Sequence, residues 1–195
     1  SHACGDIGYG RMTHPEEIIE RIKDQSKTSQ LSGCKILITA GPTREPIDPV
    51  RFMSNYSSGK MGYAIAVAAK AKGANVELIS GPVTINSIPD IKTTYVETSS
   101  EMYELVKKKV PNYDMFISTA AIADYKPANY SDTKYKKNAN NINIEFTRGI
   151  DILETISNEH KNLFTIGFAA ETDSLNDNAE EKLKKKNLDI IVGNI

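Results

Sequence analysis

The sequence predicts an α/β fold in three layers, with a mainly parallel sheet between two layers of helices. Short apolar runs rich in β-branched residues alternate along the chain with longer segments of helical period. Such runs are typical of strands buried on both faces, and their alternation with helices is typical of a parallel sheet. We therefore expect βα units joined by right-handed crossovers.

The first of these units contains the expected start of the sheet. Residues 35–40 form a short apolar run, and a glycine and a proline follow it, which predicts a buried strand that ends there. Residues 61–71 are apolar and rich in alanine, which predicts a closely packed helix. Ser57 and Ser58 precede this helix and are its N-cap candidates.

Five further strands complete the expected sheet, over residues 75–80, 92–97, 114–120, 164–169 and 188–193. Thr98 and Glu101 have the spacing of a capping box, which predicts a helix that continues to residue 110. Another helix is expected around residues 178–186, where three closing lysines would complement the helix dipole. This alternation predicts a Rossmann-like arrangement.

Two segments interrupt the alternation. Residues 126–140 have no apolar period and carry a lysine cluster, so we expect a mobile loop there, either a plain surface loop or a lid over a site. Residues 141–148 alternate between polar and apolar side chains, which predicts an additional strand, antiparallel and near a sheet edge or a dimer contact. Near the start of the chain, residues 15–27 predict a short helix, and residues 26–33 predict a polar linker.

Composition excludes several classes of function. With 195 residues, of which 39% are hydrophobic, the chain can bury one sizeable core. Its net charge of −1 gives no general attraction to nucleic acid or to an anionic membrane. No apolar run approaches the roughly 20 residues that a membrane-spanning helix needs. We therefore expect a cytoplasmic protein with neither nucleic acid nor membrane as a partner.

The residue types used most often in catalysis form no recognisable set. Cys4 and Cys34 lack the spacing of a metal site, and neither has a histidine nearby in the sequence. The three histidines fall in polar segments, where surface roles are expected. The sequence therefore predicts neither a catalytic triad nor a cysteine nucleophile.

The segment from residue 41 to residue 62 is the strongest sign of a binding site. It is a long loop between the first strand and the first helix, and a helix start offers free backbone N–H groups to an anion. No Gly-x-Gly-x-x-Gly follows the strand, and Gly59-Lys60 lacks the earlier glycine of a Walker A loop. Residues 41–62 therefore predict an anion site of a different type.

Four motifs, in order, carry a resemblance to a known family. They are Gly41-Pro-Thr-Arg-Glu-Pro-Ile-Asp-Pro-Val-Arg51 with Ser54-Asn-Tyr-Ser-Ser-Gly-Lys-Met-Gly62, then Ala120-Ala-Ile-Ala-Asp-Tyr125, Lys134-Tyr-Lys-Lys137 and Gly167-Phe-Ala-Ala-Glu-Thr172. The chain resembles the phosphopantothenoylcysteine synthetase domain of bacterial bifunctional phosphopantothenoylcysteine decarboxylase/phosphopantothenate–cysteine ligases, which belong to coenzyme A biosynthesis. Residues 3–12 resemble the end of the flavin-dependent decarboxylase domain that precedes the synthetase in those proteins.

The resemblance implies a CTP-dependent ligase that joins cysteine to 4′-phosphopantothenate. CTP would activate the carboxylate as an acyl-cytidylate and release pyrophosphate, and the amine of cysteine would then attack. Because two anions meet at the α-phosphorus, Mg²⁺ and cationic side chains would have to neutralise charge. The resemblance also implies a homodimer, and it assigns FMN only to the decarboxylase domain.

The candidate catalytic residues are Asn55 and Lys134. By resemblance, Lys134 matches the lysine needed to make the acyl-nucleotide, and Asn55 matches the asparagine that serves its conversion by cysteine. An amide held before a helix can donate to a developing oxyanion, and Arg51 can grip the phosphate of phosphopantothenate. Ala121 is the third candidate for substrate binding, after Arg51 and Asn55.

Asp124 is the candidate metal residue because it follows the fourth strand, where open α/β sheets bind ligands, and we expect it to hold Mg²⁺ beside the triphosphate. Lys134 and Lys137 lie on the expected loop and would contact phosphoryl and acyl oxygens. The full set of candidates for nucleotide binding is Gly41, Ser58, Gly59, Asp124, Lys134, Lys137 and Phe168.

The resemblance divides the chain at residue 32. We expect residues 1–32 to be the tail of the preceding flavin-dependent domain with a linker, and residues 33–195 to be the synthetase domain without its last part. Two other functions stay open. A dinucleotide-binding oxidoreductase fits the βα alternation, but it lacks the glycine fingerprint and the acidic residue after the second strand. A non-catalytic binding module would leave the loop lysines as plain surface groups.

Overall fold

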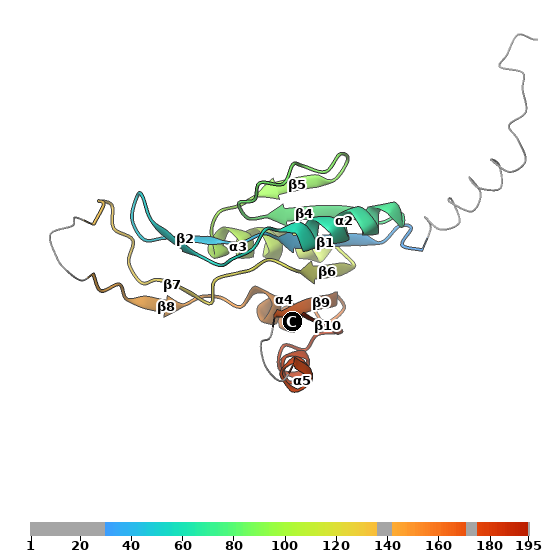
Figure 1. Cartoon of the computed structure of the whole chain (residues 1–195). Coiled ribbons are helices and arrows are strands. Elements are labelled where there is room, and N and C mark those ends of the chain that lie inside the picture. Colours follow the sequence, from blue (N-terminus) through green and yellow to red (C-terminus); the bar gives the residue numbers. More distant parts are fainter. Residues whose placement is uncertain (1–29, 136–141, 171–174, 195) are drawn as a thin grey trace, which may run out of the picture.

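The computed structural model describes residues 30–135, 142–170 and 175–194. Its centre is a parallel sheet of six strands, in the order β10-β9-β6-β1-β4-β5 (Figure 1). The strands are β1 (Lys35–Ala40), β4 (Asn75–Ser80), β5 (Lys92–Tyr95), β6 (Met115–Ser118), β9 (Phe164–Ala170) and β10 (Ile190–Asn194). The predicted α/β class and all six expected strands are confirmed, with bounds that shift by a few residues.

The strand order identifies where a ligand site is expected. From β1 the chain builds outward through β4 to β5, and it then crosses to β6 on the other side of β1. Ligands of open α/β sheets bind at such a reversal, in the crevice outside the carboxyl ends of the strands. The Rossmann-like strand order therefore predicts a ligand site at the carboxyl ends of β1 and β6.

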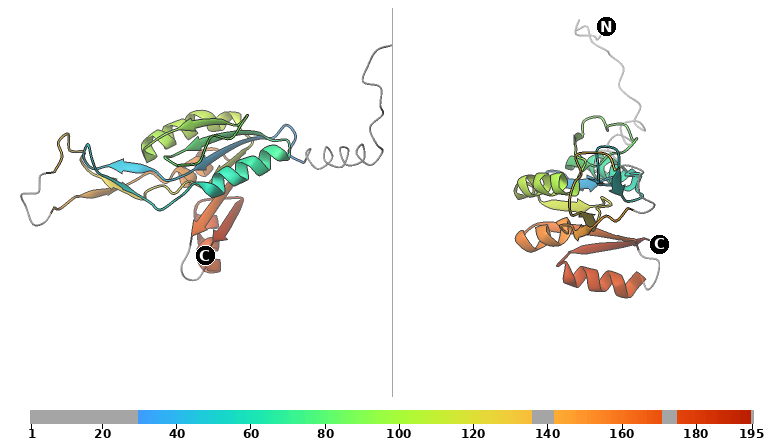
Figure 2. Two further views of the ribbon diagram at one scale, coloured as in Figure 1. Left: turned by 45° about the horizontal axis from the view of Figure 1, so that its top comes forward. Right: turned by 90° about the vertical axis from the view of Figure 1, so that its left-hand side faces the viewer.

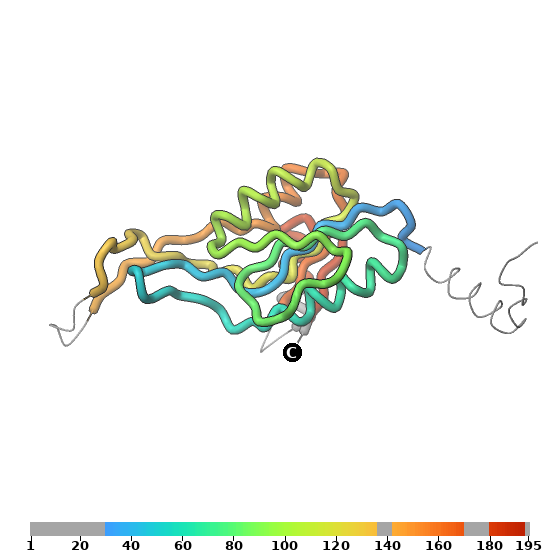
Figure 3. The backbone as a smooth tube through the Cα atoms, turned by 90° about the horizontal axis from the view of Figure 1, so that it is seen from above, coloured from blue at the N-terminus to red at the C-terminus, as the bar shows by residue number. Residues whose placement is uncertain are grey.

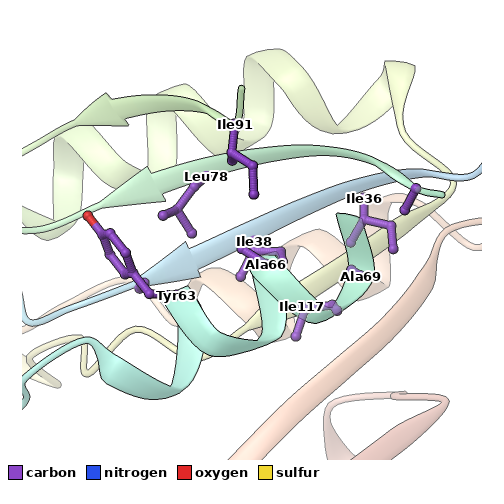
Figure 4. Close-up of a cluster of buried hydrophobic side chains, with 10 residues drawn as sticks. Ile36, Ile38, Tyr63, Ala66, Ala69, Leu78, Ile91 and Ile117 are labelled. Atoms are coloured by element: carbon purple, nitrogen blue, oxygen red, sulfur yellow. The ribbon is translucent and has the colours of Figure 1, made fainter. Parts of the chain in front are cut away.

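Helices cover both faces of the sheet, as the three-layer prediction requires. Because side chains alternate across a strand, Ile36 and Ile38 of β1 face helix α2 (Lys60–Ala71), whose alanines allow close contact (Figure 4). Leu37 faces the opposite layer, which is formed by α3 (Ser99–Lys109) and α4 (Ile152–Glu159). A 3-10 turn, η1 (Val110–Asn112), follows α3, and α5 (Leu175–Lys185) packs beside β10.

An extension projects beyond the carboxyl ends of the sheet (Figures 2 and 3). It consists of two antiparallel pairs: β2 (Arg44–Pro46) with β3 (Phe52–Ser54), and β7 (Tyr125–Pro127) with β8 (Phe146–Arg148). β2 and β7 lie against each other. The long loop after β1 and the segment after β6 therefore leave the main sheet together.

The structure corrects several local predictions. The additional strand expected over 141–148 is reduced to β8; it is antiparallel, as predicted, and it pairs with β7 outside the main sheet. β7 occupies the first part of the expected loop at 126–140, of which residues 136–140 lie outside the described residues. The three-residue strands β2 and β3 were not predicted. The helix expected over 15–27 also lies outside the described residues.

Within the described residues, no helix is both long enough and apolar enough to cross a membrane.

Candidate functional site

A cleft lies at the reversal of the strand order, between the ends of β1 and β6. Its main cavity, of about 450 Å³, is enclosed by residues 56–62, by residues 118–121, and by Phe168 and Ala169. These segments are the start of α2, the end of β6 and the end of β9, which are far apart in the sequence. Of the predicted site residues, the cavity brings together Ser58, Gly59, Ala121 and Phe168.

Two glycines shape the floor of this cleft. Gly41 and Gly59 both adopt left-handed backbone angles, with φ of 75° and 76°. A Cβ atom at Gly59 would lie 2.7 Å from Cγ1 of Val83 and 3.4 Å from Cα of Gly41. The positive φ of Gly59 and the closeness of Val83 together require glycine in the loop before α2. Gly41 does not line the cavity itself, but it packs against Gly59, which does.

The start of α2 differs from the prediction. Gly59, and neither Ser57 nor Ser58, is the N-cap, and no side chain caps this end of the helix. The N-cap residue of α2 is left-handed and has Val83 close to where its Cβ would lie, and glycine suits this position better than a serine cap does. Ser57 Oγ instead accepts a hydrogen bond from the Gly59 N–H at 3.3 Å. The first N–H groups of α2 therefore have no capping side chain and border the cavity.

Helix α2 is held tightly at this end. A Cβ atom at Gly62 would lie 2.5 Å from both Cβ of Ala40 and Oγ1 of Thr119, at the ends of β1 and β6. Thr119 Oγ1 also donates a hydrogen bond to the Thr39 carbonyl at 2.6 Å. The helix N-terminus therefore has a fixed position relative to the carboxyl ends of both strands.

A second cavity, of about 160 Å³, adjoins the first and shares Ser118, Ala120 and Phe168 with it. Asp124 lines this second cavity, so the predicted metal residue lies beside the predicted nucleotide residues. The Asp124 side chain is exposed and makes no hydrogen bond or ion pair within the described residues. A free carboxylate at this position fits Mg²⁺, which is usually held by one or two carboxylates together with substrate phosphates and water. The described residues contain no cluster of three or more His, Cys, Asp or Glu that could hold a metal alone.

Asn55 lies at the base of the extension. Its Nδ2 donates to the Ile122 carbonyl at 3.0 Å, which ties the loop before α2 to the segment after β6. Ala121 is anchored to the end of β1, because its N–H donates to the Gly41 carbonyl at 2.9 Å. Asn55, Ala121 and Asp124 therefore belong to one continuous rim.

Arg51 and Lys134 are placed elsewhere, on the extension. Arg51 Nη1 lies 3.3 Å from Asp48 Oδ2, and Arg51 Nη2 donates to the Tyr135 carbonyl at 3.5 Å. Lys134 is exposed on the same segment as Tyr135. Neither Arg51 nor Lys134 lines either cavity of the cleft. Lys137 lies outside the described residues.

Sequence reasoning missed three polar residues of the second cavity, namely Arg148, Asp151 and Lys186. Lys186 Nζ pairs with Asp151 Oδ2 at 2.7 Å, although the lysine run had been assigned only to a helix end. Asp151 also caps α4 by accepting the Glu154 N–H at 3.0 Å. An aspartate before the apolar start of α4 is a recognisable N-cap signal, but nothing local connects it with Lys186.

A larger open depression, of about 1100 Å³, lies between β5 and α3. It contains none of the predicted site residues and lies away from the reversal of the sheet. The predicted site residues that line a cavity therefore do so at the smaller cleft.

Comparisons with known proteins identify the family of the chain. Residues 31–195 match the family described as DNA/pantothenate metabolism flavoprotein C-terminal domain. The coenzyme A biosynthesis bifunctional protein CoaBC of Escherichia coli K12 is 44% identical over 200 residues, a match that covers 100% of this chain and 49% of that protein. The chain thus spans about half the length of the curated relatives it matches.

Two solved structures share the fold. A crystal structure of the C-terminal domain of CoaBC has a TM-score of 0.75 and 47% identity, and the match covers 84% of this chain and 78% of that one. A Cab2 H337A variant in complex with phosphopantothenate-cysteine has a TM-score of 0.69 over 92% of this chain and 76% of that one, and its 16% identity supports the fold alone. The chain therefore belongs to the DNA/pantothenate metabolism flavoprotein C-terminal domain family, which confirms the resemblance found in its motifs.

Proposed function

We propose that the chain is the phosphopantothenate–cysteine ligase domain of a bifunctional enzyme of coenzyme A biosynthesis. CTP activates the carboxylate of 4′-phosphopantothenate as an acyl-cytidylate and releases pyrophosphate. The amine of L-cysteine then attacks the acyl carbon, which gives 4′-phosphopantothenoylcysteine and CMP. The other domain of the bifunctional protein, which binds FMN, decarboxylates this product.

One observation carries the proposal. The cleft joins three of the four sequence motifs at the reversal of the sheet, through the start of α2, the end of β6 and the end of β9. The uncapped N–H groups of α2 suit a phosphate, and Phe168 gives an apolar wall for a ribose or a base. Asp124 would hold Mg²⁺, which neutralises phosphate charge when bound.

The proposed roles of Asn55 and Lys134 follow from their surroundings. Asn55 is fixed by its bond to Ile122 at the rim, so its amide is pre-positioned to donate to an oxyanion at the acyl carbon. Lys134 carries an exposed ammonium on the extension and would neutralise charge at phosphorus, together with Lys137. Arg51 keeps guanidinium N–H donors beyond the two that it uses here, so it can also bind the phosphate of phosphopantothenate.

Binding experiments separate this proposal from its rivals. Ligand at about 100 times its Kd adds roughly 2.7 kcal/mol to the free energy of unfolding. We expect a raised melting temperature with CTP and Mg²⁺, and no change with NADH. Stabilisation by NADH alone would favour an oxidoreductase, although Gly81 at the end of β4 packs on Pro42 where a dinucleotide-binding acidic residue is expected. No change with either ligand would favour a non-catalytic module.

The two half-reactions test the individual roles. We expect Lys134→Gln to abolish pyrophosphate release, because an amide cannot neutralise charge at phosphorus. We expect Asn55→Asp to form the acyl-cytidylate and to transfer it to cysteine about 100-fold more slowly or worse, since an oxyanion donor is lost. Rapid-quench chromatography with labelled phosphopantothenate measures both steps. Matched controls are Lys161→Gln and Asn162→Asp, which change exposed residues between α4 and β9.

Two outcomes would contradict the roles proposed for Lys134 and Asn55. If Lys134→Gln accumulates acyl-cytidylate normally, or if Asn55→Asp accumulates none, the proposed division of work between these residues is wrong.

The remaining assignments are part of the same proposal. Residues 33–195 form the ligase domain, and residues 1–32 form the tail of the preceding domain with its linker; the family match from residue 31 supports this division. The domain acts as a homodimer in the cytoplasm, with 4′-phosphopantothenate, L-cysteine and CTP as its small-molecule partners.

A further inference from the structure

Asp48 is a buried carboxylate in an otherwise exposed turn of the extension. It lies between β2 and β3, and its side chain has 0% exposure, whereas the neighbouring Val50 is 60% exposed. A buried charge is costly unless it is paired and hydrogen-bonded. The contacts of Asp48 therefore indicate what the carboxylate holds in place.

The two oxygens of this carboxylate have different partners. Oδ1 accepts the N–H groups of Val50 and Arg51, each at 2.8 Å, and these bonds lie within the turn. Oδ2 accepts the N–H of Tyr135 at 3.2 Å and pairs with Arg51 Nη1 at 3.3 Å. Oδ1 thus stabilises the turn, whereas Oδ2 joins the turn to a segment 87 residues later in the chain.

Further bonds connect the same two segments. Arg51 Nη2 donates to the Tyr135 carbonyl at 3.5 Å, so both backbone groups of Tyr135 are held by the Asp48–Arg51 pair. The Ser131 N–H donates to the Ile47 carbonyl at 3.1 Å. Lys134 lies between these anchor points, next to Tyr135.

The carboxylate is ionised at neutral pH. Burial favours its neutral form, but the N–H groups of Val50, Tyr135 and Arg51 and the charge of Arg51 outweigh burial and hold the pKa of Asp48 below its usual value. The bridge is therefore complete under the conditions in which a ligase works.

We propose that Asp48 is a positioning residue that fixes the segment bearing Lys134 against Arg51, so that both cations have set positions for the anionic substrates. The proposal rests on the ligase function proposed above. A turn that needed only stabilisation would use Oδ1 alone. The engagement of Oδ2 and the burial of the whole carboxylate indicate a second task, which is to hold the two candidate cations together.

Asp48→Asn separates the two tasks. The asparagine Oδ1 can still accept the turn N–H groups, but its Nδ2 cannot accept the Tyr135 N–H or pair with Arg51. Asp132→Asn is the matched control, because it makes the same chemical change at an exposed position on the same segment as Lys134. If Asp48→Asn does not fold, Asp48→Glu takes its place, because the longer side chain moves the oxygen that accepts the Tyr135 N–H, and the same measurements apply.

Hydrogen exchange tests the bridge without any ligand. In Asp48→Asn we expect the Tyr135 amide to exchange at least about tenfold faster, while the Val50 and Arg51 amides keep their rates. The control should leave all three amides unchanged. Equal protection of Tyr135 in the wild-type and Asp48→Asn proteins would overturn the proposal.

Kinetics tests the positioning role. Misplacement of a binding group by about 1 Å can cost on the order of 100-fold in rate, so we expect Asp48→Asn to lower kcat for pyrophosphate release by about 10- to 100-fold. We expect kcat to fall by a larger factor than the KM for CTP rises, because the cleft is unchanged and only the position of Lys134 shifts. An unchanged kcat, or an equal loss in Asp132→Asn, would overturn the role. If the wild-type chain releases no pyrophosphate, the proposed function fails and the positioning role fails with it, whereas the exchange result still decides whether the bridge exists.

Discussion

Glu77 shows how single residues hold the amino end of the sheet. Its carboxylate, on β4, is 10% exposed; it pairs with Lys109 at 2.7 Å and with Lys92 at 3.6 Å, and it accepts a hydrogen bond from the Tyr113 hydroxyl. Burial alone would raise the pKa of Glu77, but the bonds from Lys109 and Tyr113 and the charges of both lysines lower it. Burial and the Glu77 carboxylate raise the pKa of Tyr113.

These two shifts predict how stability depends on pH. The pKa of Glu77 is lower in the folded state, so its contribution is present above the unfolded value near 4.5 and is lost as pH falls through the folded value. The pKa of Tyr113 is raised, so its contribution is present below its unfolded value of about 10 and is lost as pH rises through the folded value. The cluster therefore stabilises the protein most near neutral pH.

Glu77→Gln tests the acid side of this dependence. We expect the variant to be less stable than the wild type by about 1–3 kcal/mol at pH 7, because charged hydrogen bonds are lost. The difference should shrink as pH falls below about 4, since the wild-type carboxylate is then protonated. Urea unfolding between pH 3 and 7 measures it, with the exposed Glu104→Gln as control. A difference that does not vary with pH would contradict the assignment.

At the scale of elements, helix α3 is capped from two parts of the chain. The predicted capping box is present: Thr98 Oγ1 accepts the Glu101 N–H, and Glu101 Oε2 accepts the Thr98 N–H, each at 3.1 Å. The buried Glu45, on β2, adds a third bond by accepting the Ser99 N–H at 2.9 Å. The start of α3 is therefore bonded both to the segment that precedes it and to β2 of the extension.

Substitutions of Glu45 test this connection. Glu45→Ala leaves the buried Ser99 N–H without a partner, and we expect a loss of about 1–3 kcal/mol. Glu45→Gln keeps an acceptor and loses only the favourable charge at the helix start, so a loss of about 0.3–1 kcal/mol is expected. Urea unfolding at pH 7 ranks the two variants. Equal losses would mean that the hydrogen bond to Ser99 does not set the stability of this end.

Elements with strong local patterns were predicted from the sequence, and elements without them were not. The strands of the main sheet are short runs of mostly apolar or β-branched residues, and α3 carries a capping box, so their existence follows from local residues. β2 and β3 have three residues each, which is too few to show an alternation of polar and apolar side chains. They form because they pair with each other across the turn at residues 47–51. Gly59 is the N-cap in place of the predicted serines because its backbone is left-handed and Val83 packs against it, which the local sequence does not reveal.

The residues of the candidate site also divide into those that local motifs predict and those that only the fold brings together. Ser58, Gly59, Ala121, Asp124 and Phe168 stand in motifs at strand ends or at a helix start, and the sheet brings them together in the cleft. The pair of Lys186 and Asp151 and the bridge from Asp48 to Tyr135 depend on contacts between distant segments. Such contacts become visible only in the fold.

At the scale of the whole molecule, the extension exposes apolar side chains on both of its strand pairs. The exposed fractions are 60% for Val50, 49% for Phe52, 56% for Tyr125 and 40% for Phe146. Exposed apolar side chains gathered on one projecting element are typical of a protein interface. The extension is therefore the surface through which we expect the proposed homodimer to form.

Phe146→Glu tests this expectation, because a charge in an apolar interface is left without a partner and weakens association. We expect sedimentation equilibrium to give twice the chain mass of 21.5 kDa for the wild type and to shift toward the single-chain mass for the variant. Val67→Glu is the control, since Val67 is 49% exposed on α2, away from the extension. A wild type that sediments as a single chain would contradict the homodimer, whereas a Phe146→Glu variant that stays dimeric would move the interface to another surface.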